Sequence, residues 1–235
     1  MTAAWAAGTV ATAWSGTARS AVRRVVFRRW ARGALRVLRV EVRHEGPLPP
    51  AGALVVGNHL SYLDVVVLAA LRPARFVAKR EVRDWPVWGP LARAMGTLFL
   101  ARGNPRDAAR VVTAMRQALA GGDAVVVFAE GTSSDGRGVL PIRPALLEAG
   151  VLAGGTAHTA TLRYAGAPGD PPPGIAVCWW GEMPFVPHLR ALAALRGITA
   201  HVRFGDGPVR ASDRRALARA VQDALERDFV PTTGG

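Results

Sequence analysis

The sequence predicts an α/β fold in which helices flank a mostly parallel central sheet, and two features of the chain indicate it. Short apolar runs alternate with longer segments that suit helices, an order typical of a parallel sheet. Two of these runs, residues 53–56 and 124–128, are apolar throughout, as the buried strands of parallel sheets are. The length of 235 residues fits one domain of this class with an appended helical segment.

Both of these runs stop abruptly in small and polar residues. Residues 57–64, GNHLSYLD, follow the first run, and residues 129–136, AEGTSSDG, follow the second. Loops after the carboxyl ends of parallel strands meet at one edge of the sheet, and open α/β sheets bind their ligands there. We therefore expect the two stretches to share one active site.

The first stretch places His59 and Asp64 five positions apart. On one continuous helix, five positions turn the chain by roughly 500°, which leaves the side chains on different faces. They can meet only if His59 precedes a helix and Asp64 lies in its first turns, with Asn58 or Ser61 as the cap. Asp64 then fixes the imidazole tautomer and leaves the other nitrogen free to take a proton from a substrate hydroxyl. The pair predicts a general base that needs no Ser or Cys nucleophile.

The first half of the domain alternates strands with helices. Residues 46–50, GPLPP, form a linker, because neither a helix nor an interior strand tolerates this composition. Asn104 caps the clearest amphipathic helix, which has Pro105 at its first position. The expected strands are 40–44, 53–56, 75–78, 97–100 and 124–128, and the expected helices are 63–71, 91–95 and 105–120.

The second half of the domain is expected to add three strands to the sheet. Residues 156–164 alternate apolar and polar side chains as a strand does, and a Pro/Gly loop follows at 166–174. The tail, residues 231–235, is expected to be flexible. The further expected strands are 175–180 and 197–204, and the expected helices are 146–152, 184–196 and 212–229.

The N-terminal segment, residues 1–43, is expected to associate with a membrane, and residues 44–230 to form the α/β domain. Residues 1–18 have no charged side chain and are interpreted as a helix at a membrane surface. Residues 19–43 carry nine arginines and one glutamate, a net charge of +8. Helical spacing places apolar side chains on one side of this segment, as an interfacial helix at an anionic membrane surface requires. The residues on that side are Val26, Phe27, Trp30, Ala34, Val37 and Leu38.

The net charge of +13 also fits a second class, a basic nucleic-acid-binding protein with an α/β body. The chain has no zinc-finger spacing and no aromatic RNA-binding signature, and its charge is concentrated beside the apolar stripe, which favours lipid over nucleic acid. The histidines and carboxylates show no metal-ligand spacing, so we expect no metal. Cys178 is the single cysteine, which excludes an internal disulfide.

Three blocks of the sequence resemble the glycerolipid acyltransferases of the 1-acylglycerol-3-phosphate type. The blocks are NHLSYLD (58–64), GTLFLAR (96–102) and FAEGT (128–132), and the resemblance covers roughly residues 40–205. It implies His59 as the base, Asp64 as its orienting residue, and an acceptor site at Arg102, Glu130, Gly131 and Thr132.

The chain departs from the family pattern where relatives have an arginine that binds the acceptor's phosphate. Ser133 occupies that position, and Arg137 or Arg143 are candidates to replace the arginine from nearby. The form EGTSSDG also looks like a bacterial subgroup that includes lyso-ornithine lipid acyltransferases, whose acceptor has no phosphate.

The resemblance implies a membrane-associated O-acyltransferase of phospholipid biosynthesis. Its donor would be acyl-CoA or acyl-carrier protein and its acceptor 1-acyl-glycerol-3-phosphate, with lyso-ornithine lipid or another lyso-lipid as the alternative. No other cofactor is expected. The enzyme would be a peripheral or monotopic protein at the cytoplasmic face of the cell membrane, and no nucleic-acid partner is expected.

Overall fold

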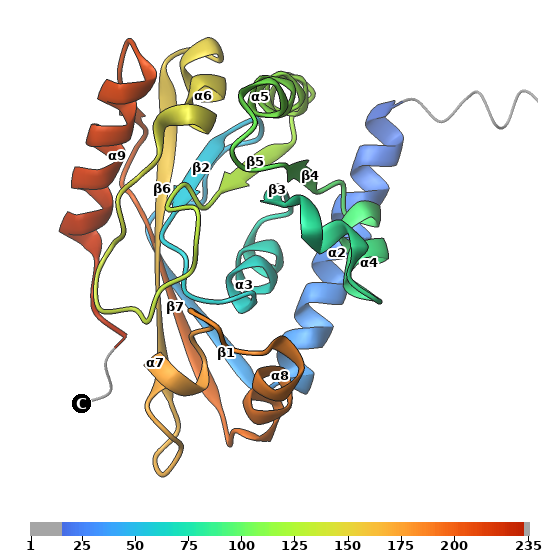
Figure 1. Ribbon diagram of the computed structural model, residues 1–235, viewed down its shortest axis with the longest axis vertical. Helices are drawn as coiled ribbons and strands as arrows, with labels where there is room; N and C mark the ends of the chain where they lie inside the picture. Colours follow the sequence, from blue (N-terminus) through green and yellow to red (C-terminus); the bar gives the residue numbers. More distant parts are fainter. Residues whose placement is uncertain (1–15, 233–235) are drawn as a thin grey trace, which may run out of the picture.

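The computed structural model describes residues 16–232 and confirms an α/β fold with a mostly parallel sheet (Figure 1). Within these residues, one sheet has the strand order β1-β7-β6-β2-β5-β3-β4, and β8 pairs with β6. The β6–β7 and β6–β8 pairs are antiparallel, and the other pairs are parallel. The strands are β1 (Val40–Glu45), β2 (Leu54–Gly57), β3 (Ala74–Lys79), β4 (Leu98–Leu100), β5 (Ala124–Val127), β6 (Thr156–Gly166), β7 (Ile198–Phe204) and β8 (Val209–Arg210).

Helices cover both faces of the sheet and bury two hydrophobic clusters against it. Figure 1 shows α5, α6 and α9 on one face and α2, α3 and α8 on the other. The helices are α2 (Gly16–Val37), α3 (Leu63–Leu71), α4 (Trp88–Ala94), α5 (Pro105–Ala120), α6 (Glu148–Leu152), α7 (Pro173–Ala176), α8 (Phe185–Ala194) and α9 (Arg214–Asp228), with 3₁₀ turns η1 (Arg80–Asp84) and η2 (Pro144–Leu147).

Four neighbouring parallel strands bring polar residues to one edge of the sheet. Strand β2 pairs with β5, β5 with β3, and β3 with β4, all in parallel. Their carboxyl ends therefore lie at the same edge, with neighbouring strands about 4.8 Å apart. In the order of these strands, the residues at or just beyond the ends are His59, Glu130, Lys79 and Arg102.

The helices predicted at 63–71 and 105–120 are confirmed. Helix α5 begins as expected, because the Asn104 side chain accepts hydrogen bonds from the backbone N–H groups of Arg106 and Asp107. The cap predicted for α3 is wrong. Its N-cap residue is Tyr62, which makes no side-chain capping bond. Asn58 instead binds the backbone of Leu162 through both ends of its amide, which ties the His59 loop to β6.

The strand predicted at 175–180 is also wrong. Residues Pro173–Ala176 form the short helix α7, whose first position is a proline, and proline at that position favours a helix start. After α7 the chain runs without regular structure to α8. The backbone N–H of Trp179 donates to the Leu60 carbonyl at 2.8 Å, so this segment binds the His59 loop and takes no part in the sheet.

Helix α2 packs against the α/β domain. Much of its apolar side, which was assigned to a membrane surface from the sequence, is buried in this contact. Phe27, Ala31 and Leu35 are buried in the core, mainly against α3. Val26 and Val37, predicted on the same side, are 60% and 78% exposed. The prediction of one continuous apolar face is therefore wrong. The side of α2 that is buried against the domain carries Phe27, Ala31 and Leu35, and the predicted residues Val26 and Val37 lie outside it. The sheet also extends into the N-terminal segment, since β1 crosses the boundary placed at residue 43.

Ser20 and three arginines join α2 and β3 to the loop before β5 through one buried carboxylate, Asp123. Asp123 is 3% exposed and accepts from Ser20 at 2.6 Å. Burial by itself would raise the pKa of Asp123. The hydrogen bonds to Asp123 and the charge of Arg23 outweigh this effect and lower the pKa from 3.8 to about 2. The three arginines lie within 2.5–2.7 Å of its oxygens and are Arg23, Arg24 and Arg75.

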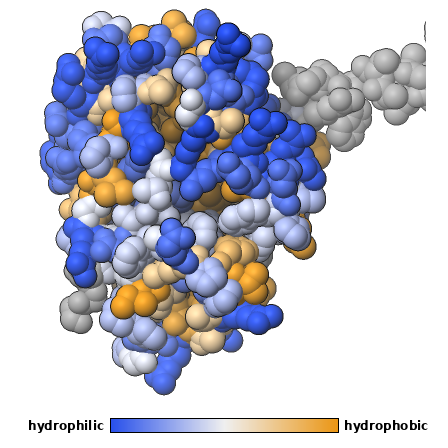
Figure 2. Space-filling view, in the orientation of Figure 1, coloured by the Kyte–Doolittle hydropathy of each residue, from blue (hydrophilic) through white to orange (hydrophobic). Residues whose placement is uncertain are grey.

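Among the described helices, none has both the length and the apolar character that crossing a bilayer requires. The helix predicted within residues 1–18 lies mainly outside the described residues. The surface is not uniform, however. Figure 2 shows apolar residues gathered in the lower half of the molecule, over α7 and α8, below a more hydrophilic upper half.

Candidate active site

The structure brings His59 and Asp64 together as the sequence predicts. His59 lies in the turn after β2, and Asp64 is the second residue of α3. The His59 Nδ1–H donates to Asp64 Oδ2 at 2.7 Å. The backbone N–H groups of Leu60 and Ser61 donate to the same oxygen at 2.8 and 3.0 Å. This arrangement fixes the imidazole tautomer and leaves Nε2 as the basic nitrogen.

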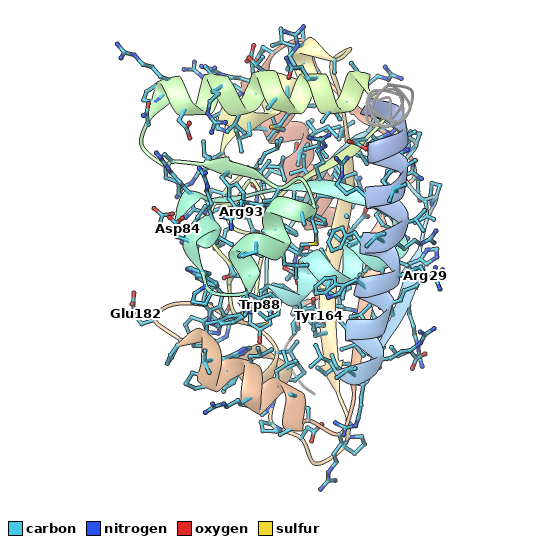
Figure 3. The ribbon with its side chains drawn as sticks, turned by 90° about the vertical axis from the view of Figure 1, so that its right-hand side faces the viewer. Arg29, Asp84, Trp88, Arg93, Tyr164 and Glu182 are labelled. Carbon is cyan, nitrogen blue, oxygen red and sulfur yellow. The ribbon has the colours of Figure 1, made fainter. Side chains whose placement is uncertain are left out.

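The second oxygen of Asp64 is held by Tyr164, a residue that the sequence analysis did not select. The Tyr164 hydroxyl on β6 donates to Asp64 Oδ1 at 2.6 Å. Tyr164 is 2% exposed, and Figure 3 places it in the interior of the molecule. Burial and the charge of Asp64 raise the pKa of this hydroxyl well above its ordinary value, so it stays a donor. No signal in the sequence marked it, because a tyrosine on a core strand is ordinary.

We expect Tyr164→Phe to lower kcat/KM for the reaction of this site by about tenfold. The phenyl ring keeps the packing, but Asp64 loses a donor and becomes free to reorient. Steady-state kinetics measure the loss in kcat/KM, and a thermal melt of the same sample measures stability. An unchanged kcat/KM together with a lower thermal stability would mean that Tyr164 serves packing alone.

The His59 ring and backbone are both fixed by the second predicted stretch. The ring stacks on Phe128 with centroids 4.2 Å apart and an angle of 11° between the planes. The His59 N–H donates to Glu130 Oε2 at 2.9 Å, and the His59 carbonyl accepts from the Ser134 N–H at 2.9 Å. The His59 side chain remains 22% exposed, so a substrate hydroxyl can approach the ring.

Glu130 is buried and connects the His59 loop to the segment that follows β5 through hydrogen bonds to both. It is 2% exposed, and its other oxygen accepts from the Leu140 N–H at 2.9 Å. Burial raises the pKa of Glu130 to about 8, against the lowering effect of the two backbone donors. Since both oxygens accept from backbone N–H groups, Glu130 holds the loop in position. Its predicted place beside His59 is found, and its part in acceptor binding stays a prediction.

Three cations lie together beside this loop, and no carboxylate within residues 16–232 comes within 4.0 Å of any of them. Burial and the charge of Arg143 lower the pKa of Arg102, and the charge of Glu81 opposes them only in part. Burial and the charge of Arg102 likewise lower the pKa of Lys79 against the opposing charge of Glu81. Mutual repulsion of this kind is relieved by a bound anion. Lys79, Arg102 and Arg143 are called the cationic trio below.

The trio reaches the predicted acceptor loop through Arg143. A Cβ atom at Gly131 would lie only 3.0–3.3 Å from the Arg143 side chain, and Gly131 has a φ of +81°. The positive φ favours glycine at this position, and the close approach of Arg143 adds to that preference. Thr132 is exposed on this loop and begins no helix. Ser133 donates its hydroxyl to the Trp179 carbonyl and so joins this loop to the segment before α8.

The comparison with known protein families identifies the chain. The family model described as acyltransferase matches residues 39–163, which includes β1 to β5, most of β6, and the His59, Arg102 and Glu130 positions. The chain belongs to the acyltransferase family. This family membership agrees with the sequence resemblance.

Individual relatives of this acyltransferase differ in the acceptors that their names state. The chain is 37% identical over 212 residues to a lyso-ornithine lipid O-acyltransferase of Brucella abortus, covering 81% of this chain and 74% of that protein. It is 33% identical over 206 residues to a 1-acyl-sn-glycerol-3-phosphate acyltransferase of Neisseria gonorrhoeae, covering 83% and 76%. The crystal structure of the 1-acyl-sn-glycerophosphate acyltransferase from Thermotoga maritima superposes with a TM-score of 0.63 at 21% identity, covering 89% and 79%, and shows that the fold is shared.

The acyltransferase site presents a base but no nucleophilic side chain bonded to it. Within the described part of the chain, no serine hydroxyl or cysteine thiol forms a hydrogen bond with His59. Cys178 is fully buried, and burial raises the pKa of its thiol. Among residues 16–232, no three His, Cys, Asp or Glu side chains are grouped to hold a metal ion. The chemistry that these side chains offer is proton abstraction from a hydroxyl.

Proposed function

We propose that this acyltransferase moves a fatty acyl group from a thioester donor to the free hydroxyl of 1-acyl-glycerol-3-phosphate, which yields phosphatidic acid. The observation that carries the proposal is the pairing of the His59–Asp64 base with the cationic trio at the same sheet edge. A phosphate monoester carries about two negative charges near pH 7, and guanidinium groups bind its oxygens in pairs. The family membership and the acceptor named for the Neisseria relative support this choice.

The transfer is a direct displacement. His59 Nε2 takes the proton from the acceptor hydroxyl while the oxygen attacks the thioester carbonyl, and Asp64 stabilises the resulting imidazolium. The carbon–sulfur bond then breaks, and the thiolate leaves with the proton that His59 returns. No acyl-enzyme forms, because no Ser or Cys among residues 16–232 is bonded to the base. Acyl-CoA and acyl-carrier protein both supply the required thioester.

The second candidate acceptor is lyso-ornithine lipid. Ser133 replaces the arginine expected at the phosphate, and its hydroxyl is occupied by the Trp179 carbonyl. The Brucella relative is named for this acceptor. An ornithine headgroup offers one carboxylate and one ammonium group, so it satisfies fewer cations than a phosphate does. The cationic trio therefore favours the phosphate-bearing acceptor.

Arg143→Gln separates the two acceptors. With lysophosphatidic acid we expect the variant to raise KM by about 10- to 100-fold, because a charge-assisted contact to phosphate is lost. With lyso-ornithine lipid the change should be much smaller. Arg137→Gln is the matched control, since Arg137 is near in sequence, its side chain is 80% exposed, and it pairs with Asp135. Wild-type transfer to lyso-ornithine lipid alone would overturn the choice of acceptor.

We further propose that the enzyme works as a peripheral protein on the cytoplasmic face of an anionic cell membrane. Lyso-lipid acceptors reside in membranes, and both thioester donors are cytoplasmic. The net charge of +13 supports attraction to anionic lipid.

A further inference from the structure

Two segments far apart in sequence build one aromatic cluster beside the catalytic loop. Trp85 and Trp88 flank the turn between η1 and α4, Trp179 lies in the segment before α8, and Phe185 is the first residue of α8. Their rings meet at centroid distances of 5.2–6.2 Å. Tyr62, three residues after His59, packs against Phe185 at 5.0 Å. In Figure 3, Trp88 lies between α4 and α8.

The cluster is anchored rigidly to the catalytic loop. The Tyr62 hydroxyl donates to His188 Nδ1 at 3.0 Å, and the His188 Nε2–H donates to the Cys178 carbonyl at 3.1 Å. Trp179 donates its backbone N–H to Leu60. The surface of the cluster is therefore held at a fixed position relative to His59.

Three large apolar side chains that adjoin the aromatic residues of this cluster in the sequence are exposed. Val87 lies between the two tryptophans of the turn and is 75% exposed, Val186 follows Phe185 and is 53% exposed, and Trp180 follows Trp179 and is 38% exposed. Val87 also has a φ of +66°, a strained conformation for a β-branched residue. Exposed apolar side chains beside an aromatic cluster are candidates for contact with a partner. Val87, Val186 and Trp180 are called the apolar rim below.

The segments that carry the rim have a small excess of basic residues. Leaving out Lys79 and Arg102, which belong to the cationic trio, residues 80–101 and 179–196 contain five basic and three acidic residues, a net charge of +2. Arg83, Arg93 and Arg190 are exposed and, within the described residues, lie in no ion pair. An apolar surface with a Trp, set among arginines, matches the interface of an anionic bilayer, where apolar groups insert and arginines meet lipid phosphates.

We propose that the apolar rim is the surface by which the enzyme docks on an anionic lipid bilayer. The inference deepens the proposed function, because a lyso-lipid leaving the bilayer there meets the catalytic loop directly. It also differs from the expectation that helix α2 docks. Arg23 and Arg24 of α2 bind Asp123, and Arg28 and Arg32 donate to the Ala70 carbonyl, so these four arginines serve the domain.

Vesicle co-sedimentation of the full chain tests whether the rim or helix α2 is the surface that binds the bilayer. The rim variant is Val87→Asp with Val186→Asp. Asp lacks the β-branch of Val, which relieves crowding at Val87, and Asp suits the first turn of a helix, so both changes fit the fold. The control is Val25→Asp with Val26→Asp, which adds the same charge at α2 positions that are 58% and 60% exposed. Vesicles of phosphatidylcholine, with and without phosphatidylglycerol, are the probe.

We expect the wild type to bind the vesicles that contain phosphatidylglycerol, and the rim variant to bind them about tenfold or more weakly. The α2 control should stay within about threefold of the wild type. Both variants should retain activity on a water-soluble short-chain acceptor. Full binding by the rim variant, or an equal loss in the two variants, would overturn the proposal. Binding is measured without a donor, so a failure of acyl transfer would overturn the proposed function and leave this inference standing.

Discussion

His59→Ala is expected to lower acyl transfer by about 10³- to 10⁴-fold while the chain remains folded. The substitution removes the only imidazole that is paired with a buried carboxylate in the described residues. Asp64 keeps its donors from Leu60, Ser61 and Tyr164, so the loop retains most of its hydrogen bonds. Turnover of a saturating lyso-lipid and thioester, with a thermal melt of the same sample, measures both parts of this prediction.

The matched control for this experiment is His44→Ala. His44 is exposed on β1 and contacts Phe204 at a ring distance of 6.4 Å, on a strand that carries no site residue. It should keep full activity. Asp64→Asn should lose about 10²- to 10⁴-fold, because the amide preserves the geometry and removes the charge that stabilises the imidazolium. A His59→Ala protein with a tenth or more of the wild-type rate would rule out the general-base role.

Asp123→Ala is expected to reduce the free energy of unfolding by about 2–4 kcal/mol, near the low end of the range for breaking a buried ion pair. The substitution leaves three arginines without their shared carboxylate. Their side chains are 21–35% exposed, and the water that reaches them keeps the loss below the buried-pair maximum. For a chain of this size the melting temperature should fall by about 10 °C. Chemical denaturation gives the free energy directly.

The pH dependence of this contribution has a definite sign. The pKa of Asp123 is lowered from 3.8 to about 2 in the folded protein, so its stabilising effect is complete above pH 3.8 and is lost as the pH falls through about 2. Asp206→Ala is the control, since the Asp206 side chain is 86% exposed and pairs with Arg203 only at 3.6 Å. It should change stability by less than about 0.5 kcal/mol. Equal losses in the two variants would show that the Asp123 cluster contributes nothing beyond a surface pair.

The part of the site that depends on local sequence could be predicted. The His59 turn, the start of α3 and the strand before Glu130 follow from short apolar runs and their polar ends, and the parallel order of β2 and β5 brings them together. Spacing alone restricts how His59 and Asp64 can meet, and the structure has that geometry.

The part that depends on distant segments could not be predicted. Tyr164 reaches Asp64 from a strand one hundred residues later, and Trp179 binds Leu60 from a loop mistaken for a strand. The helical periodicity of α2 predicted an apolar face but not what covers it, because the same stripe suits a membrane or a protein core. Phe27, in contact with Phe76 of β3 at 6.3 Å, faces the core.

Direct transfer from donor to acceptor is tested by a rapid-quench experiment with a labelled acyl thioester, once as acyl-CoA and once as acyl-carrier protein. The wild-type chain is mixed with the donor in the presence and absence of lysophosphatidic acid, and the protein and lipid are separated. We expect the label to pass into phosphatidic acid, with none on the protein at any time and no thiol released without the acceptor. Label that accumulates on the protein before the lipid product appears would contradict the role assigned to His59 and Asp64.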